Sequence, residues 1–197
     1  MRYSITLPVP LQSPILMNRA KRALDEAVCI GPWITADSHG YHNVLDIGCG
    51  AALTSICLAK ALKFERLWLM DGQQGSYTNG FKQDTRPWED ISRAHMIAEA
   101  NLDCCDWKII DPDSTLRGSF TFIMSLLSWG HHYPIEVYLD MVKASLIYGG
   151  RLVVDIRKVT RANKAPDGLK TLTNNGFRLL KQLDETKKCN RYVLERE

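Results

Sequence analysis

Two short stretches of the sequence combine residue types that can do chemistry. In VLDIGCGAA, an acid at Asp46 precedes two spaced glycines, Gly48 and Gly50, directly after an apolar run. Either glycine can take a positive φ without a Cβ clash, so the backbone can turn tightly and approach a ligand. A carboxylate beside that turn suits an ammonium group and is awkward for a pyrophosphate. The second stretch, SWGHHYP, holds His131 and His132, whose imidazoles titrate near neutral pH and could serve as a general base.

The composition is that of a globular chain with a small net charge. With 197 residues, of which 45% are hydrophobic, we expect a single domain over residues 1–197, with residues 1–42 as an N-terminal segment. The net charge is +3 and the basic residues are scattered, so nucleic acid is not an expected partner. No apolar run reaches the roughly 18–20 residues of a membrane span, and the N-terminus lacks the apolar middle of a signal peptide. We therefore expect a cytoplasmic protein without a membrane partner.

The cysteines do not predict a metal site. None of the six forms a Cys-x-x-Cys pattern, and the adjacent pair Cys104 and Cys105 cannot easily chelate one ion. We expect buried, reduced thiols and no metal.

Apolar and helical segments alternate along the chain and predict the scaffold that positions these residues. Short apolar runs predict buried strands at residues 43–48, 66–71, 107–111, 120–126 and 151–157. Helical patterns lie between or before them, at residues 15–28, 53–62, 88–101 and 135–147. Residues 176–197 read as two alternating runs about a polar turn. We expect an α/β, doubly wound, Rossmann-like fold: a seven-stranded, mostly parallel sheet with a reversed C-terminal strand hairpin.

The glycine turn lies where such a sheet binds ligands. Ligands of open parallel sheets bind outside the carboxyl ends of the strands at the switch point, which is usually beside the first strand. A dinucleotide fingerprint would place a third glycine at position 53, where the chain has Leu53, and would not place Asp46 beside the phosphates. Both departures disfavour a nicotinamide dehydrogenase.

The same stretch resembles the first motif of the class I S-adenosylmethionine-dependent methyltransferases, acid-x-Gly-x-Gly-x-Gly, with Ala52 in place of the last glycine. The likeness extends from about Asn43 through LMDG, IIDPDSTL and FTFIMSLLSWGHH to the terminal hairpin. It implies methyl transfer with S-adenosylmethionine as cofactor.

The resemblance also implies roles for single residues. Gly48 and Gly50 would pass near the methionine part, and Asp71 would accept hydrogen bonds from the ribose hydroxyls. Asp111 would lie near the adenine amino group, with Asp113 as the competing choice. The cofactor-binding set implied in this way is Asp46, Gly48, Gly50, Asp71, Gly72, Asp111, Ser125 and Leu126.

The expected acceptor is a hydroxyl of a small molecule. The segments SWGHHYPIEVYLD and GGRLVVDIRK look similar to sugar O-methyltransferase-like members, so a sugar is one acceptor and an anionic compound another. His131 or His132 would be the catalytic base, with His132 slightly preferred; capping of the next helix is the structural alternative. Arg157 and Lys158 could hold an anionic group or remain solvated, and Trp129 could stack on the acceptor or pack internally.

Residues 72–90 form a long connection that could act as a substrate lid, with Tyr77, Phe81 and Trp88 as anchors.

Two alternative functions share this fold. An RNA 2′-O-methyltransferase would use a Lys-Asp-Lys-Glu set, for which Lys21, Lys158 and Glu195 are available, but Thr121 occupies the usual position of the acid near the start of strand four. A non-catalytic binding subunit would not need the intact acids and glycines. The oligomeric state is not determined by the sequence.

Overall fold

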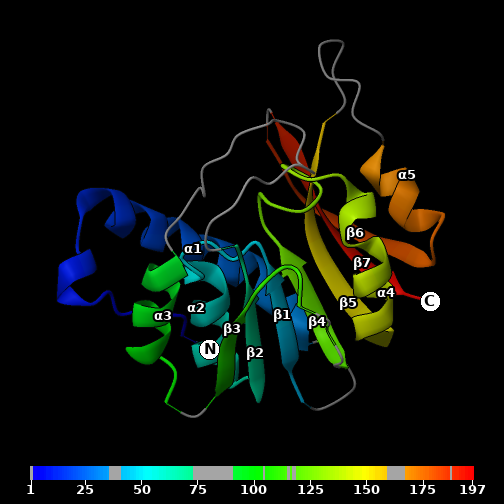
Figure 1. The fold of residues 1–197 in the computed structure, drawn as a ribbon. Helices are drawn as coiled ribbons and strands as arrows, with labels where there is room; N and C mark the ends of the chain where they lie inside the picture. The colour runs from blue at the N-terminus through cyan, green and yellow to red at the C-terminus, as the bar shows by residue number, and fades with distance from the viewer. Residues whose placement is uncertain are drawn as a thin grey trace.

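The computed structural model describes residues 2–35, 41–72, 91–103, 105–114, 116, 119–158, 167–186 and 188–197. Within them the strands form one sheet in the order β3-β2-β1-β4-β5-β7-β6 (Figure 1). Neighbours among β1 to β5 pair in parallel, and β7 runs antiparallel to β5 and β6. This confirms the predicted fold class. The strands are β1 (Asn43–Ile47), β2 (Arg66–Met70), β3 (Asp106–Ile110), β4 (Phe120–Ser125), β5 (Leu146–Arg157), β6 (Phe177–Glu185) and β7 (Cys189–Arg196).

Helices cover both faces of the sheet. One buried cluster joins Val44 to the helices α1 (Pro14–Thr35), α2 (Leu53–Leu62) and α3 (Ile91–Glu99). A second cluster joins Leu45 and Ile47 to the 3₁₀ turn η2 (Ile135–Val137) and the helices α4 (Leu139–Ser145) and α5 (Gly168–Thr173). Because successive strand residues point to opposite faces, Asp46 lies on the face that α1 and α2 cover. None of the described helices is long and apolar enough to cross a membrane.

The N-terminal helix is longer than predicted. It was expected at residues 15–28, but α1 continues to Thr35 through Gly31 and Pro32. Burial explains the extension, because Ile30 and Ile34 are fully buried against the sheet and compensate for the hydrogen bond that a proline cannot donate. Gly31 also contacts the N-terminal segment, where η1 (Val9–Leu11) lies; a Cβ at this glycine would be 1.9 Å from the Tyr3 hydroxyl oxygen.

The boundary between α4 and β5 was predicted wrongly. The helix expected at residues 135–147 is the short turn η2 followed by α4, which ends at Ser145. Leu146 already has extended backbone, pairs with Phe120 of β4 and is fully buried. An apolar residue buried in this way looks the same in a helix or a strand, so periodicity alone could not place the boundary.

Two further helices differ from the sequence prediction. The helix expected at residues 88–101 is described as α3 from Ile91, because residues 88–90 lie outside the described part of the chain. The helix α5 was not predicted, since six residues are too few for a clear period. Its signal in the sequence is Asp167, whose carboxylate accepts a hydrogen bond from the backbone amide of Lys170 at 3.2 Å and caps the helix.

The cysteines follow the expectation only in part. The five described cysteines are free thiols, and Cys57 and Cys189 are buried as expected. Cys49 and Cys105 are half-buried, and Cys29 on α1 is exposed, which corrects the expectation that all are buried.

Candidate functional site

The turn between β1 and α2 is built from left-handed backbone. Gly48 has φ 71° and Gly50 has φ 55°, the conformation for which glycine was expected. The carbonyl of Met70, at the end of β2, accepts hydrogen bonds from the backbone amides of Gly48 at 2.7 Å and Cys49 at 3.2 Å. A Cβ on Gly48 would lie 1.8 Å from the Ser128 hydroxyl oxygen. The turn is therefore held between the end of β2 and the loop after β4.

Asp71, the residue after β2, fixes this turn through its carboxylate. One carboxylate oxygen accepts the Gly50 amide at 2.7 Å, and the other accepts the Gly72 amide at 2.8 Å. Hydrogen bonds from amides to an ionised carboxylate are stronger than those between neutral groups. The acid that the sequence placed near a ribose is thus also the anchor of the glycine turn.

Ala52 occupies the position where the family motif has its third glycine, and it keeps the glycine-like backbone. Its φ is 54°, a left-handed conformation that costs an L-residue roughly 1–2 kcal/mol. The methyl group is only 2% exposed and belongs to the cluster under α1 and α2. Burial of this methyl offsets part of the cost of the left-handed backbone.

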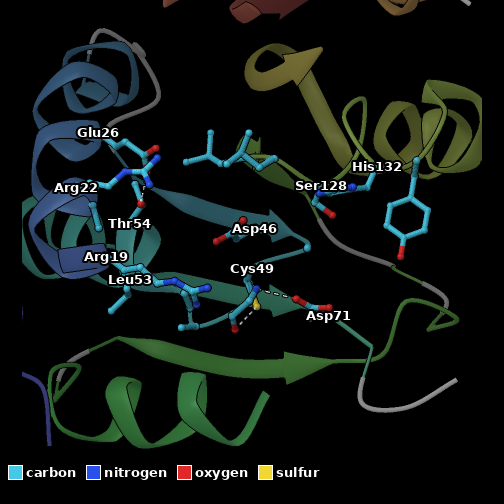
Figure 2. A pocket seen from close by; sticks show the side chains of 18 residues that line it. Arg19, Arg22, Glu26, Asp46, Cys49, Leu53, Thr54, Asp71, Ser128 and His132 are labelled. Atoms are coloured by element: carbon cyan, nitrogen blue, oxygen red, sulfur yellow. Dashed lines mark hydrogen bonds between the residues drawn. The ribbon is translucent and has the colours of Figure 1, made fainter. Parts of the chain in front are cut away.

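A cavity of about 420 Å³ opens beside the carboxyl ends of β1 and β2. Its walls are α1, the glycine turn with the start of α2, Asp71, and the loop after β4. Figure 2 shows the α1 side chains on one side, Asp46 between the walls, and Ser128 with His132 on the opposite side.

Asp46 is a buried acid inside this cavity, with a side chain 4% exposed to solvent. Burial raises its pKa from 3.8 to about 7; a hydrogen bond from Ser55 opposes the rise, and the charges of Asp71 and Glu26 add to it. Because the folded pKa is raised, protonation of Asp46 stabilises the fold fully below pH 3.8, and this stabilisation is lost as the pH rises through about 7. Near neutral pH the carboxyl can therefore respond to the charge of a ligand.

Arg19, Arg22 and Glu26 of α1 line the cavity and were not among the predicted site residues. Their spacing of three and four residues puts them on one helical stripe beside the buried stripe of Leu16 and Ala23. In the sequence this is an ordinary polar helix face. Only the packing of α1 against α2 turns that face toward the cavity (Figure 2).

The loop after β4 forms the opposite wall. Leu127 has φ 56°, and its amide donates to a carboxylate oxygen of the buried Asp155 at 3.1 Å. The carbonyl of Ser128 accepts the amides of His131 at 3.0 Å and His132 at 2.6 Å. Burial and the charge of Asp71 raise the pKa of Tyr133, which also lines the cavity. The loop thus presents Leu127, Ser128, His132 and Tyr133 to the cavity as one compact turn.

Solved structures of other proteins share this architecture, although the sequence matches no protein-family model and no curated protein. Magnesium protoporphyrin IX methyltransferase from Synechocystis PCC 6803, solved with S-adenosylmethionine bound, is 17% identical and covers 94% of this chain and 86% of its own, with a TM-score of 0.63. An amino pentose methyltransferase from Micromonospora echinaspora, also solved with S-adenosylmethionine, is 12% identical over 100% of both chains, with a TM-score of 0.60. The chain has the class I S-adenosylmethionine-dependent methyltransferase fold.

A third structure with the class I methyltransferase fold belongs to an O-methyltransferase family 2 protein from Planctomyces limnophilus in complex with apigenin. It is 12% identical, covers 93% of this chain and 60% of its own, and has a TM-score of 0.64. At such identities the likeness shows the fold, which agrees with the resemblance first seen in the glycine motif.

The methyltransferase fold brings most of the predicted cofactor residues to the cavity. Those that line it are Asp46, Gly48, Gly50, Asp71 and Leu126. Gly72 lies beside them and donates its amide to Asp71. Their assignment as cofactor ligands stays a prediction.

Ser125 lies behind the cavity wall instead of in it. It is fully buried; its hydroxyl donates to the carbonyl of Ile47 at 2.7 Å and accepts the amide of Trp129 at 2.9 Å. Ser125 therefore ties the loop after β4 to the end of β1. The place predicted for Ser125 and Leu126 beside the sulfonium stays a prediction.

Asp111 is not among the described residues that line the cavity. It follows β3, is exposed, and accepts the backbone amide of Asp113 at 2.9 Å within a tight turn. Neither acid is brought to the described cavity, so the contact to an adenine stays a prediction for both.

The two adjacent histidines occupy different environments. His132 lines the cavity, whereas His131 is buried outside it, and its Nδ1 atom has no hydrogen-bond partner among the described residues. Burial, and then the charges of His132, Arg157 and Lys188, lower the pKa of His131 to about 4. His131 is thus a weak base at neutral pH, and the structure favours His132 for the catalytic role predicted for the pair.

Trp129 packs internally, which is one of the two alternatives that the sequence left open. Its side chain is fully buried, and its indole N–H donates to the carbonyl of Ile135 at 2.8 Å. The guanidinium Nε of Arg157 donates to the carbonyl of His131 at 2.8 Å, and the ammonium of Lys158 pairs with Glu185 at 2.5 Å. Neither cation lines the cavity, so an anion-binding role for them stays a prediction.

The residues considered for RNA methylation do not meet at the cavity. Glu195 forms an ion pair with Arg178 at 2.5 Å on the C-terminal hairpin, and Lys158 is paired with Glu185. Lys21 is exposed on α1 outside the cavity lining. The long connection with Tyr77, Phe81 and Trp88 lies outside the described residues.

Gly48→Ala should lower the free energy of unfolding by about 2 kcal/mol or more, because a left-handed φ is costly for alanine and the added methyl collides with Ser128. Urea denaturation followed by circular dichroism measures the change. Gly176→Ala is the matched control, because φ there is 86° but the nearest atom to an added Cβ is 3.9 Å away. A second change, Ser128→Gly, should restore the steric part of the loss. The predicted collision would be contradicted if Gly48→Ala and Gly176→Ala lost equal free energies of unfolding and if adding Ser128→Gly to Gly48→Ala restored none of the loss.

Proposed function

We propose that the chain is a cytosolic S-adenosylmethionine-dependent methyltransferase that transfers a methyl group to a hydroxyl of a small molecule. The observation that carries the proposal is Asp71, whose carboxylate lies in the cavity at the end of β2 and binds the amide of Gly50 in the glycine turn. This arrangement stands at the point of the sheet where the fold binds nucleosides. Two solved proteins with the same fold were crystallised with S-adenosylmethionine, which supports this cofactor.

The residues around the cavity fit a nucleoside that carries an amino acid. The turn at Gly48 and Gly50 presents main chain without side chains, and the oxygens of Asp71 have further lone pairs for ribose hydroxyls. Asp46 would bind the α-ammonium group, and the α1 cations Arg19 and Arg22 would face the α-carboxylate. When bound, the cofactor supplies a methyl group on a positively charged sulfur.

The chain contributes alignment and a proton acceptor to the reaction. In-line displacement at a methyl group requires the nucleophile to be positioned and competing water to be excluded. Leu126 and Leu127 provide apolar lining beside the end of β4, and His132 provides an imidazole at the same wall. A neutral imidazole nitrogen would accept the proton of the acceptor hydroxyl as its oxygen forms the new bond to carbon.

The acceptor class rests on the chemistry of this wall and on the solved relatives. One relative is named as an amino pentose methyltransferase, and another was solved with apigenin, so proteins with this fold take small molecules of both kinds. His132 and Tyr133 would contact a hydroxylated acceptor from the loop after β4. The net charge of the whole chain is only +3, which does not favour RNA as the acceptor.

S-adenosylhomocysteine should bind the purified chain, and Asp71→Ala should weaken binding by about 1–3 kcal/mol, because the charge-assisted hydrogen bonds to the ribose are lost and the glycine turn loses its anchor. Isothermal titration calorimetry measures both affinities. Asp184→Ala, an equal change at an exposed position of β6, should leave the affinity unchanged. Absence of S-adenosylhomocysteine binding, or binding of NAD instead, would reject the proposed function.

The affinity for S-adenosylhomocysteine should rise between pH 6 and pH 8, because a ligand ammonium binds the ionised form of Asp46, whose pKa is raised to about 7. Below pH 7, where the carboxyl of Asp46 is mostly protonated, binding of S-adenosylhomocysteine must release the proton of that carboxyl. Titrations in two buffers of different ionisation enthalpy measure the released protons.

Two controls isolate the carboxyl group that causes this pH dependence. Asp46→Asn should abolish the proton release, and 5′-methylthioadenosine, which lacks the ammonium group, should bind without proton release to the unaltered chain. The same proton release for both ligands would show that Asp46 does not face the amino acid end.

His132→Gln should reduce turnover roughly 10²- to 10⁴-fold with little change in cofactor affinity, because the variant lacks the proton acceptor but keeps the cavity. Transfer of a radiolabelled methyl group to an acceptor found by screening sugars, nucleotides and small phenols measures turnover. His131→Gln is the matched control and should retain activity, since His131 lies outside the cavity. Wild-type turnover in the His132 variant would mean that catalysis depends on alignment alone.

A further inference from the structure

Arg191 of β7 lies outside the cavity but contacts groups that connect to both of its walls. It is directly opposite Asp155 in the antiparallel pairing of β5 and β7. Its guanidinium donates to the two carboxylate oxygens of Asp155, from Nε at 2.7 Å and from Nη2 at 2.9 Å. The side chains are 8% and 1% exposed, so this is a buried, bidentate ion pair.

The first connection runs to the α1 wall. The same Nη2 atom donates to Glu26 at 3.2 Å, and the other oxygen of Glu26 accepts the hydroxyl of Thr54 at 2.8 Å. Glu26 and Thr54 both line the cavity, and they belong to different helices. Arg191 therefore holds in place the carboxylate that joins α1 to the first turn of α2.

The second connection runs through Asp155 to the loop after β4. The Asp155 oxygen that accepts Nη2 of Arg191 also accepts the amide of Leu127, whose φ of 56° is left-handed. A non-glycine residue keeps such a backbone only where its surroundings determine it. The carboxylate fixed by Arg191 is thus the acceptor that holds Leu127 against the cavity.

The charges of this group also favour a cationic ligand. One guanidinium is shared by two carboxylates, Asp155 and Glu26, and the carboxyl of Asp46 lies near Glu26. Burial alone would lower the pKa of Arg191, but the hydrogen bonds and charges of Asp155 and Glu26 raise it, so the guanidinium stays charged. In the cavity itself, Arg19 and Arg22 stand against three acids, Glu26, Asp46 and Asp71, so an ammonium group beside Asp46 would add a balancing positive charge.

We propose that Arg191 is a positioning residue that sets the separation of the two walls at the end of the cavity where the amino acid part of the cofactor binds. This inference rests on the proposed function. Arg191 belongs to the C-terminal hairpin and is remote in sequence from the glycine turn, yet it would control the affinity for the amino acid part of the ligand. The nucleoside part, held by Asp71 and the glycine turn, does not depend on Arg191.

Comparison of two ligands tests this assignment without any acceptor. S-adenosylhomocysteine carries the amino acid part, and 5′-methylthioadenosine lacks it. Arg191→Lys keeps the charge but cannot donate to Asp155 and Glu26 with the same fork. Calorimetric titration of this variant should show S-adenosylhomocysteine binding weakened about tenfold or more, with 5′-methylthioadenosine unchanged within a factor of two.

Arg178→Lys is the matched control, because Arg178 pairs with Glu195 and Glu197 on the same hairpin away from the cavity. Both ligands should bind it as they bind the unaltered chain. Asp155→Asn is a second variant, nearly equal in volume, and should show the same selective loss, since an amide cannot accept both guanidinium hydrogen bonds and the Leu127 amide. Circular dichroism confirms that each variant is folded.

The possible outcomes separate this proposal from the proposed function. Unchanged S-adenosylhomocysteine affinity in folded Arg191→Lys, or an equal loss for both ligands, would overturn the positioning role while leaving the methyltransferase proposal intact. Failure of the unaltered chain to bind either ligand would overturn both.

Discussion

The hydrogen bond between the Asp71 carboxylate and the Gly50 amide is the contact on which the site depends. It joins the ends of the two strands β1 and β2, and it lies where the backbone takes left-handed conformations at residues 48, 50 and 52. Such a turn leaves its main-chain amides without helical or strand partners, and a carboxylate at the neighbouring strand end satisfies one of them. The geometry of the cavity follows from this junction, because α2 begins directly after the turn and α1 packs against α2.

Carboxylates, one of them buried, give the cavity its electrostatic character. Asp46, Asp71 and Glu26 all line it, and the pKa of Asp46 is raised chiefly by burial and further by the charges of Asp71 and Glu26. Proteins keep acids in such unfavourable surroundings where a ligand or a fixed cation stabilises their ionised form. Here the guanidinium of Arg191 balances the charge of Glu26. Asp46 has a pKa of about 7, so its charge can change when a ligand binds. A zwitterionic amino acid attached to a nucleoside, as proposed here, would pair with both the acids of the cavity and the arginines on α1.

The loop after β4 shows how a packed core can position reactive groups. Trp129 is buried beneath the loop, Ser125 ties the loop to β1, and Asp155 holds the amide of Leu127. These three contacts leave little freedom to the cavity-facing residues Ser128 and His132. Their environment explains why two adjacent histidines differ: the same turn that exposes one imidazole to the cavity buries the other in the protein, where the charged form is disfavoured.

The scaffold and the glycine turn can be predicted from the sequence alone. The sheet and its reversed hairpin could be predicted because their signals are local in the sequence. These signals are the continuous apolar strands, the helix that begins and ends at the predicted residues 53–62, and the polar break before the last strand. The positive φ at Gly48 and Gly50 could also be predicted, because few other residues accept it. The residues that surround the turn, in contrast, depend on how distant segments pack together. Arg19, Arg22 and Glu26 read as an ordinary polar helix face, and Asp155 and Arg191 as isolated charges 36 positions apart. Their roles arise from burial and from contacts between distant segments, which a local pattern does not contain.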